Sequence, residues 1–132
     1  MDLTFDSLFN RQMGFEGCVL ESMEEGEVKM RTRVSESACN LYGFAHGGFL
    51  FTLCDTLAGL VGYTLGSLVV TQQASISYLK RAEKDEELFL EGKVIHNGRS
   101  SKVVETSIRN AEDVLLCRAT FQLFPVAAVP KE

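Results

Sequence analysis

The segment from Gly47 to Thr64, GGFLFTLCDTLAGLVGYT, is apolar on nearly every side and carries one charge, Asp55. A helix with so continuous an apolar surface has to be enclosed by other elements, because it offers no polar face to water. An unpaired carboxylate in such surroundings costs folding free energy, and we therefore expect Asp55 to have a functional role. The segment therefore predicts a helix that the rest of the chain wraps, with Asp55 as the candidate reactive group.

A transmembrane helix is the competing interpretation of residues 43–70. However, an aspartate at the centre of a bilayer costs about 2.5–3.5 kcal/mol on insertion scales. Six glycines also dilute the apolar run, and neither flank carries a cluster of Lys or Arg. We therefore expect no membrane partner.

Composition places the chain among ordinary globular proteins. Its 132 residues are 45% apolar and 23% charged, which predicts a single domain over residues 1–132. A net charge of −5 with scattered basic residues argues against nucleic acid as a partner. The acidic N-terminus, MDLTFDSLFNRQ, is not typical of a signal peptide.

The cysteines indicate the compartment. They show no CxxC pair and no metal-ligand spacing, and they stand at Cys18, Cys39, Cys54 and Cys117. This pattern predicts reduced thiols in a cytoplasmic protein without a metal site. Cys39 could be a nucleophile, but no His or Asn arrangement supports that role.

Segments rich in β-branched and aromatic residues lie on both sides of the predicted helix. The ones before it flank a Glu-Glu-Gly turn and the ones after it include the strong hairpin signal Asn97-Gly98. The predicted strands cover residues 17–23, 27–34, 69–81, 87–96, 100–109 and 114–124. Outside them, residues 3–14 predict a short amphipathic helix and residues 125–132 a frayed tail.

This order of elements predicts an α+β fold. A single curved antiparallel sheet, with its last four strands in a meander, can wrap around one long central helix. That arrangement is hotdog-like.

Small residues share the Asp55 side of the helix. Steps of three and four along the sequence give Gly48, Thr52, Asp55, Gly59 and Gly62. Glycine inside a helix costs about 1 kcal/mol relative to alanine. Several on one face therefore suggest that a narrow ligand or another backbone passes close by, with tight packing inside the fold as the alternative.

The start of the helix offers hydrogen-bond donors. Its first N–H groups, including those of Gly47 and Gly48, have no partner within the helix. Together with the positive end of the helix dipole they suit an oxygen that becomes negative. Asp55 lies about 12 Å further along by helical rise, so attack on a carbonyl held at the helix start needs groups from elsewhere as well.

The pattern N-x-x-G-x-x-H-G-G-x-x-F-x-L-x-D resembles the hotdog-fold acyl-CoA thioesterases, above all the phenylacetate-pathway (PaaI-like) branch. It is filled by Asn40, Gly43, His46, Gly47, Gly48, Phe51, Leu53 and Asp55. The segments SISYLKRA and HNGRSSKVVE also resemble parts of that family. The resemblance covers nearly the whole chain and implies the hotdog fold.

The resemblance also implies roles for single residues. Gly47 would donate its N–H to the thioester carbonyl, and Asp55 would act as nucleophile or general base. Asn40 and His46 would orient water, substrate or the leaving thiolate. Thr71 best matches a hydroxyl that relatives place near the attacking water from the neighbouring subunit.

Substrate contacts are expected at Gly48, Lys80, Arg81, Arg99 and Ser100. The cations lie at predicted strand ends, where the resemblance places the coenzyme A phosphates, although solvated surface charges are the alternative. The implied substrate is an acyl-CoA with an aryl or medium-chain acyl group. Coenzyme A is then part of substrate and product, no cofactor is needed, and the protein is a homo-oligomer, a dimer or a tetramer.

Two other functions stay open at this point. One is a hotdog module that binds acyl thioesters without turnover, which the intact set Asn40, His46 and Asp55 disfavours. The other is a hotdog hydratase or dehydratase acting on enoyl or hydroxyacyl thioesters, which would release no thiol.

Overall fold

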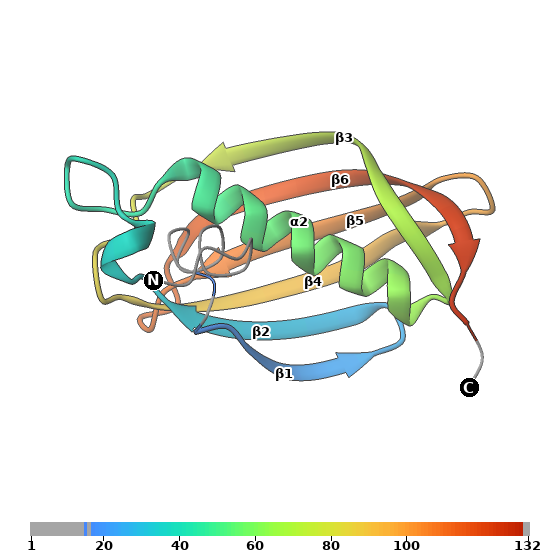
Figure 1. Ribbon diagram of the computed structural model, residues 1–132, viewed down its shortest axis with the longest axis horizontal. Coiled ribbons are helices and arrows are strands. Elements are labelled where there is room, and N and C mark those ends of the chain that lie inside the picture. The colour runs from blue at the N-terminus through green and yellow to red at the C-terminus, as the bar shows by residue number, and fades with distance from the viewer. Residues whose placement is uncertain (1–14, 16, 131–132) are drawn as a thin grey trace, which may run out of the picture.

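The computed structural model describes residue 15 and residues 17–130, and shows one long helix against a six-stranded antiparallel sheet (Figure 1). The helix α2 spans Gly47–Thr64, and a short 3-10 turn, η2, covers Glu36–Ala38. The strands are β1 (Val19–Glu24), β2 (Glu27–Arg33), β3 (Ser67–Tyr78), β4 (Glu87–Asn97), β5 (Lys102–Arg109) and β6 (Leu115–Ala128). The predicted α+β hotdog arrangement and the predicted bounds of the central helix are confirmed.

The strand order in the sheet is β1-β2-β4-β5-β6-β3. The predicted meander is therefore wrong at one step, because β3 pairs with β6 and not with β4. The cause is α2, which carries the chain along the inner face of the sheet, so that the next strand enters at the far edge. The place beside β2 is then taken by β4, with Arg33 opposite Glu87 and Glu27 opposite Lys93.

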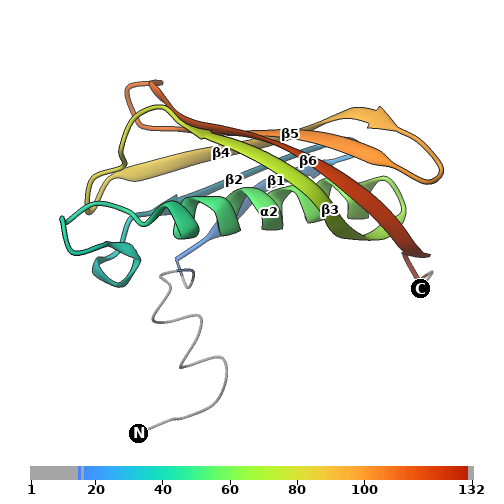
Figure 2. The ribbon, with the colours of Figure 1, turned by 90° about the horizontal axis from the view of Figure 1, so that it is seen from above.

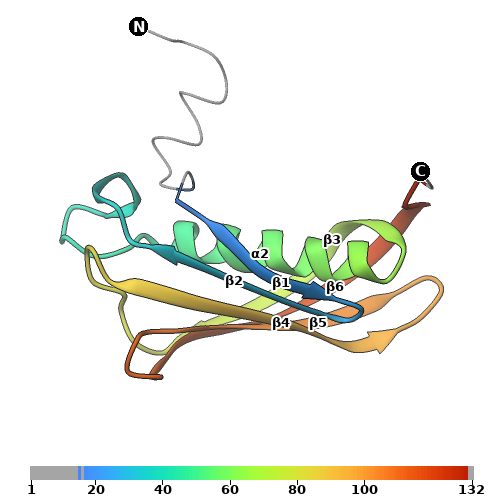
Figure 3. The same cartoon turned by 90° about the horizontal axis from the view of Figure 1, so that it is seen from below.

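The core lies between α2 and the concave face of the sheet (Figures 2 and 3). The buried side chains of α2 include Leu53, Leu57 and Val61. Gly92 on β4 lies beneath them, and a Cβ there would stand 3.0 Å from Leu57 Cγ and 3.1 Å from Val61 Cγ2. Glycine at this position lets the helix approach the sheet closely. No helix in the described part of the chain is long and apolar enough to cross a membrane.

Both ends of α2 are tied to the sheet. At its end, Thr64 Oγ1 accepts a hydrogen bond from the Gly26 N–H at 2.9 Å. At its start, the Tyr78 hydroxyl donates to the Gly47 carbonyl at 2.8 Å. The helix that carries Asp55 is therefore held at a fixed position along the sheet.

Two turns differ in how well they were predicted. The Glu-Glu-Gly hairpin is confirmed, since Glu24 pairs with Glu27 and Gly26 has a φ of 84°. The turn at Asn97 is longer than the two-residue form, because β5 begins only at Lys102. The buried Lys102 ammonium group donates to the Asn97 side chain and to the Gly98 carbonyl, and these bonds stabilise the wider loop.

The prediction of a frayed tail is wrong for residues 125–129. Strand β6 continues to Ala128, which pairs with Ser67, and the Val129 N–H donates to the Gly66 carbonyl at 2.9 Å. Pro125 is tolerated because the register between β3 and β6 shifts beside it, at Leu68/Val69. The short helix predicted at residues 3–14 lies outside the described residues.

Candidate active site

The start of α2 presents two backbone donors. His46 is the N-cap, its φ and ψ are −59° and 139°, and its side chain makes no capping hydrogen bond. Its own N–H donates to the Ala38 carbonyl at 2.8 Å. Within the described residues, no acceptor takes a hydrogen bond from the N–H of Gly47 or Gly48. These two groups are therefore available to a ligand oxygen, as the sequence predicts.

Two hollows flank these donors. One, of about 290 Å³, is lined by Asn40, Phe44, Ala45, Gly47, Leu50, Tyr78, Leu79, Lys80 and Arg81. The other, of about 260 Å³, is lined by Ser37, Ala38, His46, Gly48 and Phe49. A Cβ at Gly48 would meet nothing within 4 Å, so a ligand has room to reach the backbone there.

Asn40 organises the loop before α2. Its side-chain oxygen accepts hydrogen bonds from the N–H groups of Tyr42, at 2.9 Å, and Phe44, at 3.4 Å. This Asx turn shapes the wall of the larger hollow, and Gly43 follows it with a φ of 88°. The oxygen of Asn40 is thus engaged by its own loop, and the carboxamide N–H groups are the part that could act on a ligand.

Asp55 is paired with a hydroxyl. It lies half-buried near the middle of α2, and its Oδ1 accepts a hydrogen bond from Thr71 Oγ1 at 2.5 Å. Thr71 belongs to β3 of the same chain, so the structure places this hydroxyl on its own chain's Asp55. No Lys or Arg among the described residues lies within 4.0 Å of the Asp55 carboxylate.

The predicted stripe of small residues is mostly open. A Cβ at Gly59, like one at Gly48, would meet nothing within 4 Å. Gly62 differs, because a Cβ there would stand 2.7 Å from Val69 Cγ2. Packing inside the chain therefore explains Gly62, whereas Gly48 and Gly59 have open space beside them.

The predicted substrate cations do not lie together in one chain. Lys80 and Arg81 follow β3 beside the start of α2, whereas Arg99 and Ser100 lie in the β4–β5 turn at the other end of the sheet (Figure 1). Arg81 is also engaged: it donates to Glu83 at 2.7 Å and lies 5.2 Å from the Phe44 ring centroid.

Most other cations of the described chain are paired with carboxylates. Those with no carboxylate oxygen within 4.0 Å among the described residues are Lys80, Lys84, Arg99 and Lys102. Lys80 and Arg99 therefore remain the exposed cations of the predicted set that are free to meet a phosphate.

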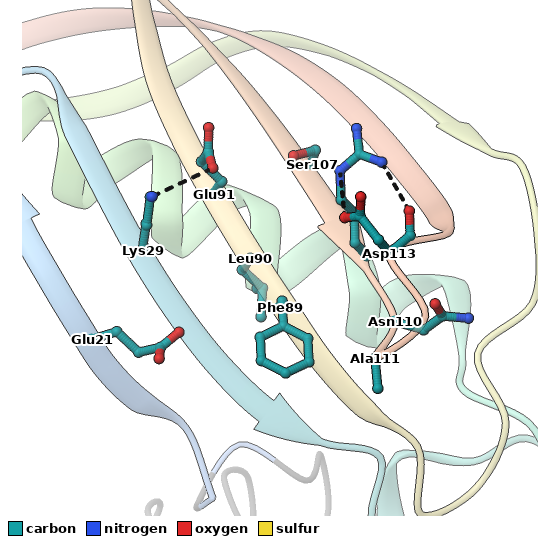
Figure 4. A pocket seen from close by; sticks show the side chains of 10 residues that line it. Glu21, Lys29, Phe89, Leu90, Glu91, Ser107, Asn110, Ala111 and Asp113 are labelled. Carbon is teal, nitrogen blue, oxygen red and sulfur yellow. Dashed lines mark hydrogen bonds and ion pairs between the residues drawn. The ribbon is translucent and has the colours of Figure 1, made fainter.

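A hollow of about 360 Å³ also lies on the outer face of the sheet, away from α2 (Figure 4). Both of its cations are paired with carboxylates, with Lys29 4.0 Å from Glu91 and Arg109 3.9 Å from Asp113. None of the predicted site residues lines it. We place the site at α2 because the free backbone donors and the hydroxyl-bound carboxylate are there.

Cys39 is unsuited to nucleophilic attack. Its thiol donates to the Ser35 carbonyl at 3.4 Å, and burial raises its pKa above the ordinary value for cysteine. The thiolate, which is the reactive form, is therefore disfavoured at neutral pH.

A model of the thioesterase superfamily matches residues 42–117, which include α2, β3, β4 and β5. The chain belongs to the thioesterase superfamily. It is a thioester hydrolase by this membership, and the resemblance drawn from the sequence is confirmed.

Solved structures of two similar proteins agree with this chain over most of its length. A hypothetical thioesterase of Streptococcus pneumoniae, solved with coenzyme A, is 43% identical, with a TM-score of 0.86 over 88% of this chain and 94% of that one. Two further structures of that protein carry alanine in place of an aspartate and of a threonine sixteen residues after it. A Streptococcus mutans protein bound to acetyl-CoA is 40% identical, with the same TM-score and the same coverage.

The Escherichia coli PaaI protein of the phenylacetic acid degradation operon has the same fold. Its TM-score is 0.83 at 22% identity, over 91% of this chain and 85% of that one.

One residue of this thioesterase site was missed by sequence reasoning. Tyr78 lines the larger hollow and donates a hydrogen bond to the Gly47 carbonyl. In the sequence it is one aromatic residue within a predicted strand, and nothing beside it marks it as functional. Its place at the end of the strand that follows the central helix was the available signal.

Proposed function

We propose that this thioesterase hydrolyses an acyl-CoA to the free acid and coenzyme A, with Asp55 as its essential carboxylate. The observation that carries the proposal is the pairing of Asp55 with Thr71 on a helix whose first N–H groups have no acceptor among the described residues. A hydroxyl-bound carboxylate can activate water or attack a carbonyl carbon, and free N–H groups can hold the resulting oxyanion.

In the proposed reaction the thioester oxygen accepts hydrogen bonds from the helix start, where Gly47 is the principal donor and Gly48 borders the bound substrate. Oxygen from water, or from Asp55 first and water second, forms the new bond to the carbonyl carbon. The carbon–sulfur bond then breaks, and the thiolate of coenzyme A takes a proton. His46 and the Asn40 carboxamide lie where they can orient substrate, water or the leaving thiolate.

The distance between the two parts of the site supports a site shared by two chains. Along α2, Gly47 and Asp55 are about 12 Å apart, too far for both to act on one carbonyl. The open space beside Gly48 and Gly59 leaves room for a ligand and a second chain. We therefore propose a homo-oligomer in which the donors of one chain and the carboxylate of its partner meet at one substrate.

The comparisons support both the substrate and the reactive pair. The Streptococcus pneumoniae relative was solved with coenzyme A, and the Streptococcus mutans relative with acetyl-CoA. The pneumococcal aspartate and threonine that were replaced by alanine have the spacing that separates Asp55 from Thr71. The small hollows beside the helix start suit an aryl or medium-chain acyl group.

We propose no metal or redox cofactor, because a carboxylate, water and backbone N–H groups suffice for thioester hydrolysis. A cytoplasmic location is also proposed. It is supported by the cysteine pattern of the sequence, which has four cysteines and no CxxC pair.

The proposal is tested with Asp55→Asn, which keeps the shape of the side chain but removes its basicity. The rate constant kcat is expected to fall by about 10²- to 10⁴-fold, the usual contribution of acid–base catalysis, with substrate binding retained. The assay follows free thiol released from a panel of aryl- and alkyl-CoA esters. Hydrolysis by the variant at nearly the rate of the unaltered protein would show that Asp55 is structural.

A further inference from the structure

We infer that Tyr78 is a positioning residue for the helix-start donors: its hydroxyl holds the Gly47 carbonyl and so fixes the peptide that carries the Gly48 N–H, directly after the principal donor, the Gly47 N–H. The inference rests on the proposed function, since it names a residue that prepares the same site. Tyr78 itself need not touch the reacting atoms.

The contact is specific in its geometry. Tyr78 is the last residue of β3 and lies opposite Cys117 of β6. Its hydroxyl donates to the Gly47 carbonyl at 2.8 Å. The ring closes over Gly47 as well, because a Cβ there would stand 3.2 Å from Tyr78 Cζ and 3.3 Å from its hydroxyl oxygen. Glycine is therefore what lets the ring lie against the helix start.

The helix start needs such a support because its own residues define it poorly. Two consecutive glycines have the greatest backbone freedom and the weakest preference for helix among residues other than proline. The N-cap His46 adds no side-chain hydrogen bond. Thr52 Oγ1 does donate to the Gly48 carbonyl at 2.9 Å, but it belongs to the same helix and cannot fix the helix relative to the sheet. The Tyr78 hydrogen bond links the first turn to β3.

The hydrogen bond also strengthens a donor. The Gly47 carbonyl and the Gly48 N–H belong to one peptide group, so a donor on the oxygen polarises the N–H at its other end. Partial burial of the half-exposed ring, and next the nearby Cys117 and Cys54, raise the pKa of the Tyr78 phenol above its ordinary value. The phenol therefore keeps its proton at neutral pH and remains a donor.

The test compares Tyr78→Phe with the matched control Tyr63→Phe. Tyr63 lies on α2 near its other end, about 24 Å from Gly47 by helical rise, so its variant loses the same hydroxyl far from the donors. With a CoA thioester, Tyr78→Phe should lower kcat by about 3- to 10-fold and leave KM unchanged, as expected for the loss of one neutral hydrogen bond. Tyr63→Phe should match the unaltered protein in both constants.

A second measurement is independent of turnover. In protein labelled with ¹³C and ¹⁵N at glycine, Tyr78→Phe should move the Gly47 carbonyl and Gly48 amide resonances, while Tyr63→Phe should leave them in place. Circular dichroism and the melting temperature establish that both variants are folded.

The outcomes separate the inference from the proposed function. A normal kcat in Tyr78→Phe, or a raised KM with a normal kcat, overturns the positioning role while hydrolysis itself stands. If the unaltered protein hydrolyses no CoA thioester, the proposed function fails. The Gly47 carbonyl and Gly48 amide resonances then still test whether Tyr78 positions the helix start. Resonances that do not move overturn the inference in either case.

Discussion

At the scale of single residues, the proposed chemistry depends most on the contact between Thr71 and Asp55. The Thr71 hydroxyl donates to one carboxylate oxygen and leaves the other for water or substrate. Thr71→Val keeps the shape of the side chain and removes the donor, so the carboxylate loses its orientation. Because a hydrogen bond to a charged group contributes about 1.5–3 kcal/mol, kcat should fall by about 10-fold or more.

Thr71→Ser is the control for that change, since it restores a hydroxyl at the same position and should recover most of the rate. Steady-state assays of thiol release measure both variants. Equal rates in the valine and serine variants would contradict an orienting role for the hydroxyl.

Some of these site residues could be predicted from the sequence, and others could not. Asp55 stood out because its charge is isolated in an apolar helix, and Gly47 because it begins that helix. Thr71 was found only through the resemblance, since no local pattern links it to Asp55. The Asx turn of Asn40 and the bond from Tyr78 depend on loop and tertiary geometry, which residue types alone do not fix.

At the scale of elements, β3 and the β4–β5 turn carry the unpaired cations to opposite ends of the sheet. Along β6, the residues beside Lys80 and Lys102 are Leu116 and Leu123, about 23 Å apart at strand rise. If two β3 edges pair antiparallel, the Lys80 end of one sheet lies beside the Arg99 end of the other. The two cations could then hold the phosphates of one coenzyme A.

Arg99→Ala tests this arrangement. It should raise KM for CoA esters more than for truncated pantetheine esters, because only the former carry the phosphates that an arginine binds. The control is Arg118→Ala. Arg118 lies on the outer face and bonds Glu105 at 2.7 Å, so its loss should change KM for neither ester type. An equal rise for both ester types in Arg99→Ala would show that no phosphate contact was lost.

Elements were predicted better than their partners in the sheet. The bounds of α2 and the Glu-Glu-Gly hairpin follow from local periodicity and turn chemistry. The pairing of β3 with β6 joins segments separated by two other strands, and no local pattern encodes it. The same long-range pairing turned residues 125–128 into strand, although their proline and alanines predict a loose tail.

At the scale of the whole molecule, the two edges of the sheet are unequal. β1 is an edge of six residues, whereas β3 is an edge of twelve residues with exposed apolar side chains such as Val70, at 51%, and Leu68, at 39%. A long apolar edge strand offers unpaired backbone groups to another chain. We expect a dimer or tetramer that covers this edge and completes the site.

Light scattering at micromolar concentration measures the assembly, and the activity is assayed over the same dilution series. Activity per chain should fall where the oligomer dissociates. A monomer with full activity would contradict both the assembly and the shared site.

The position of β3 has a consequence for how the chain acquires its fold. β3 follows α2 directly, but its partner β6 comes only after β4 and β5 have been made. Until β6 is available, β3 lacks the strand with which it pairs in the finished sheet. Contacts between distant segments slow folding, and exposed strand edges favour aggregation meanwhile. The six-stranded sheet can therefore be completed only after β6 has been synthesised.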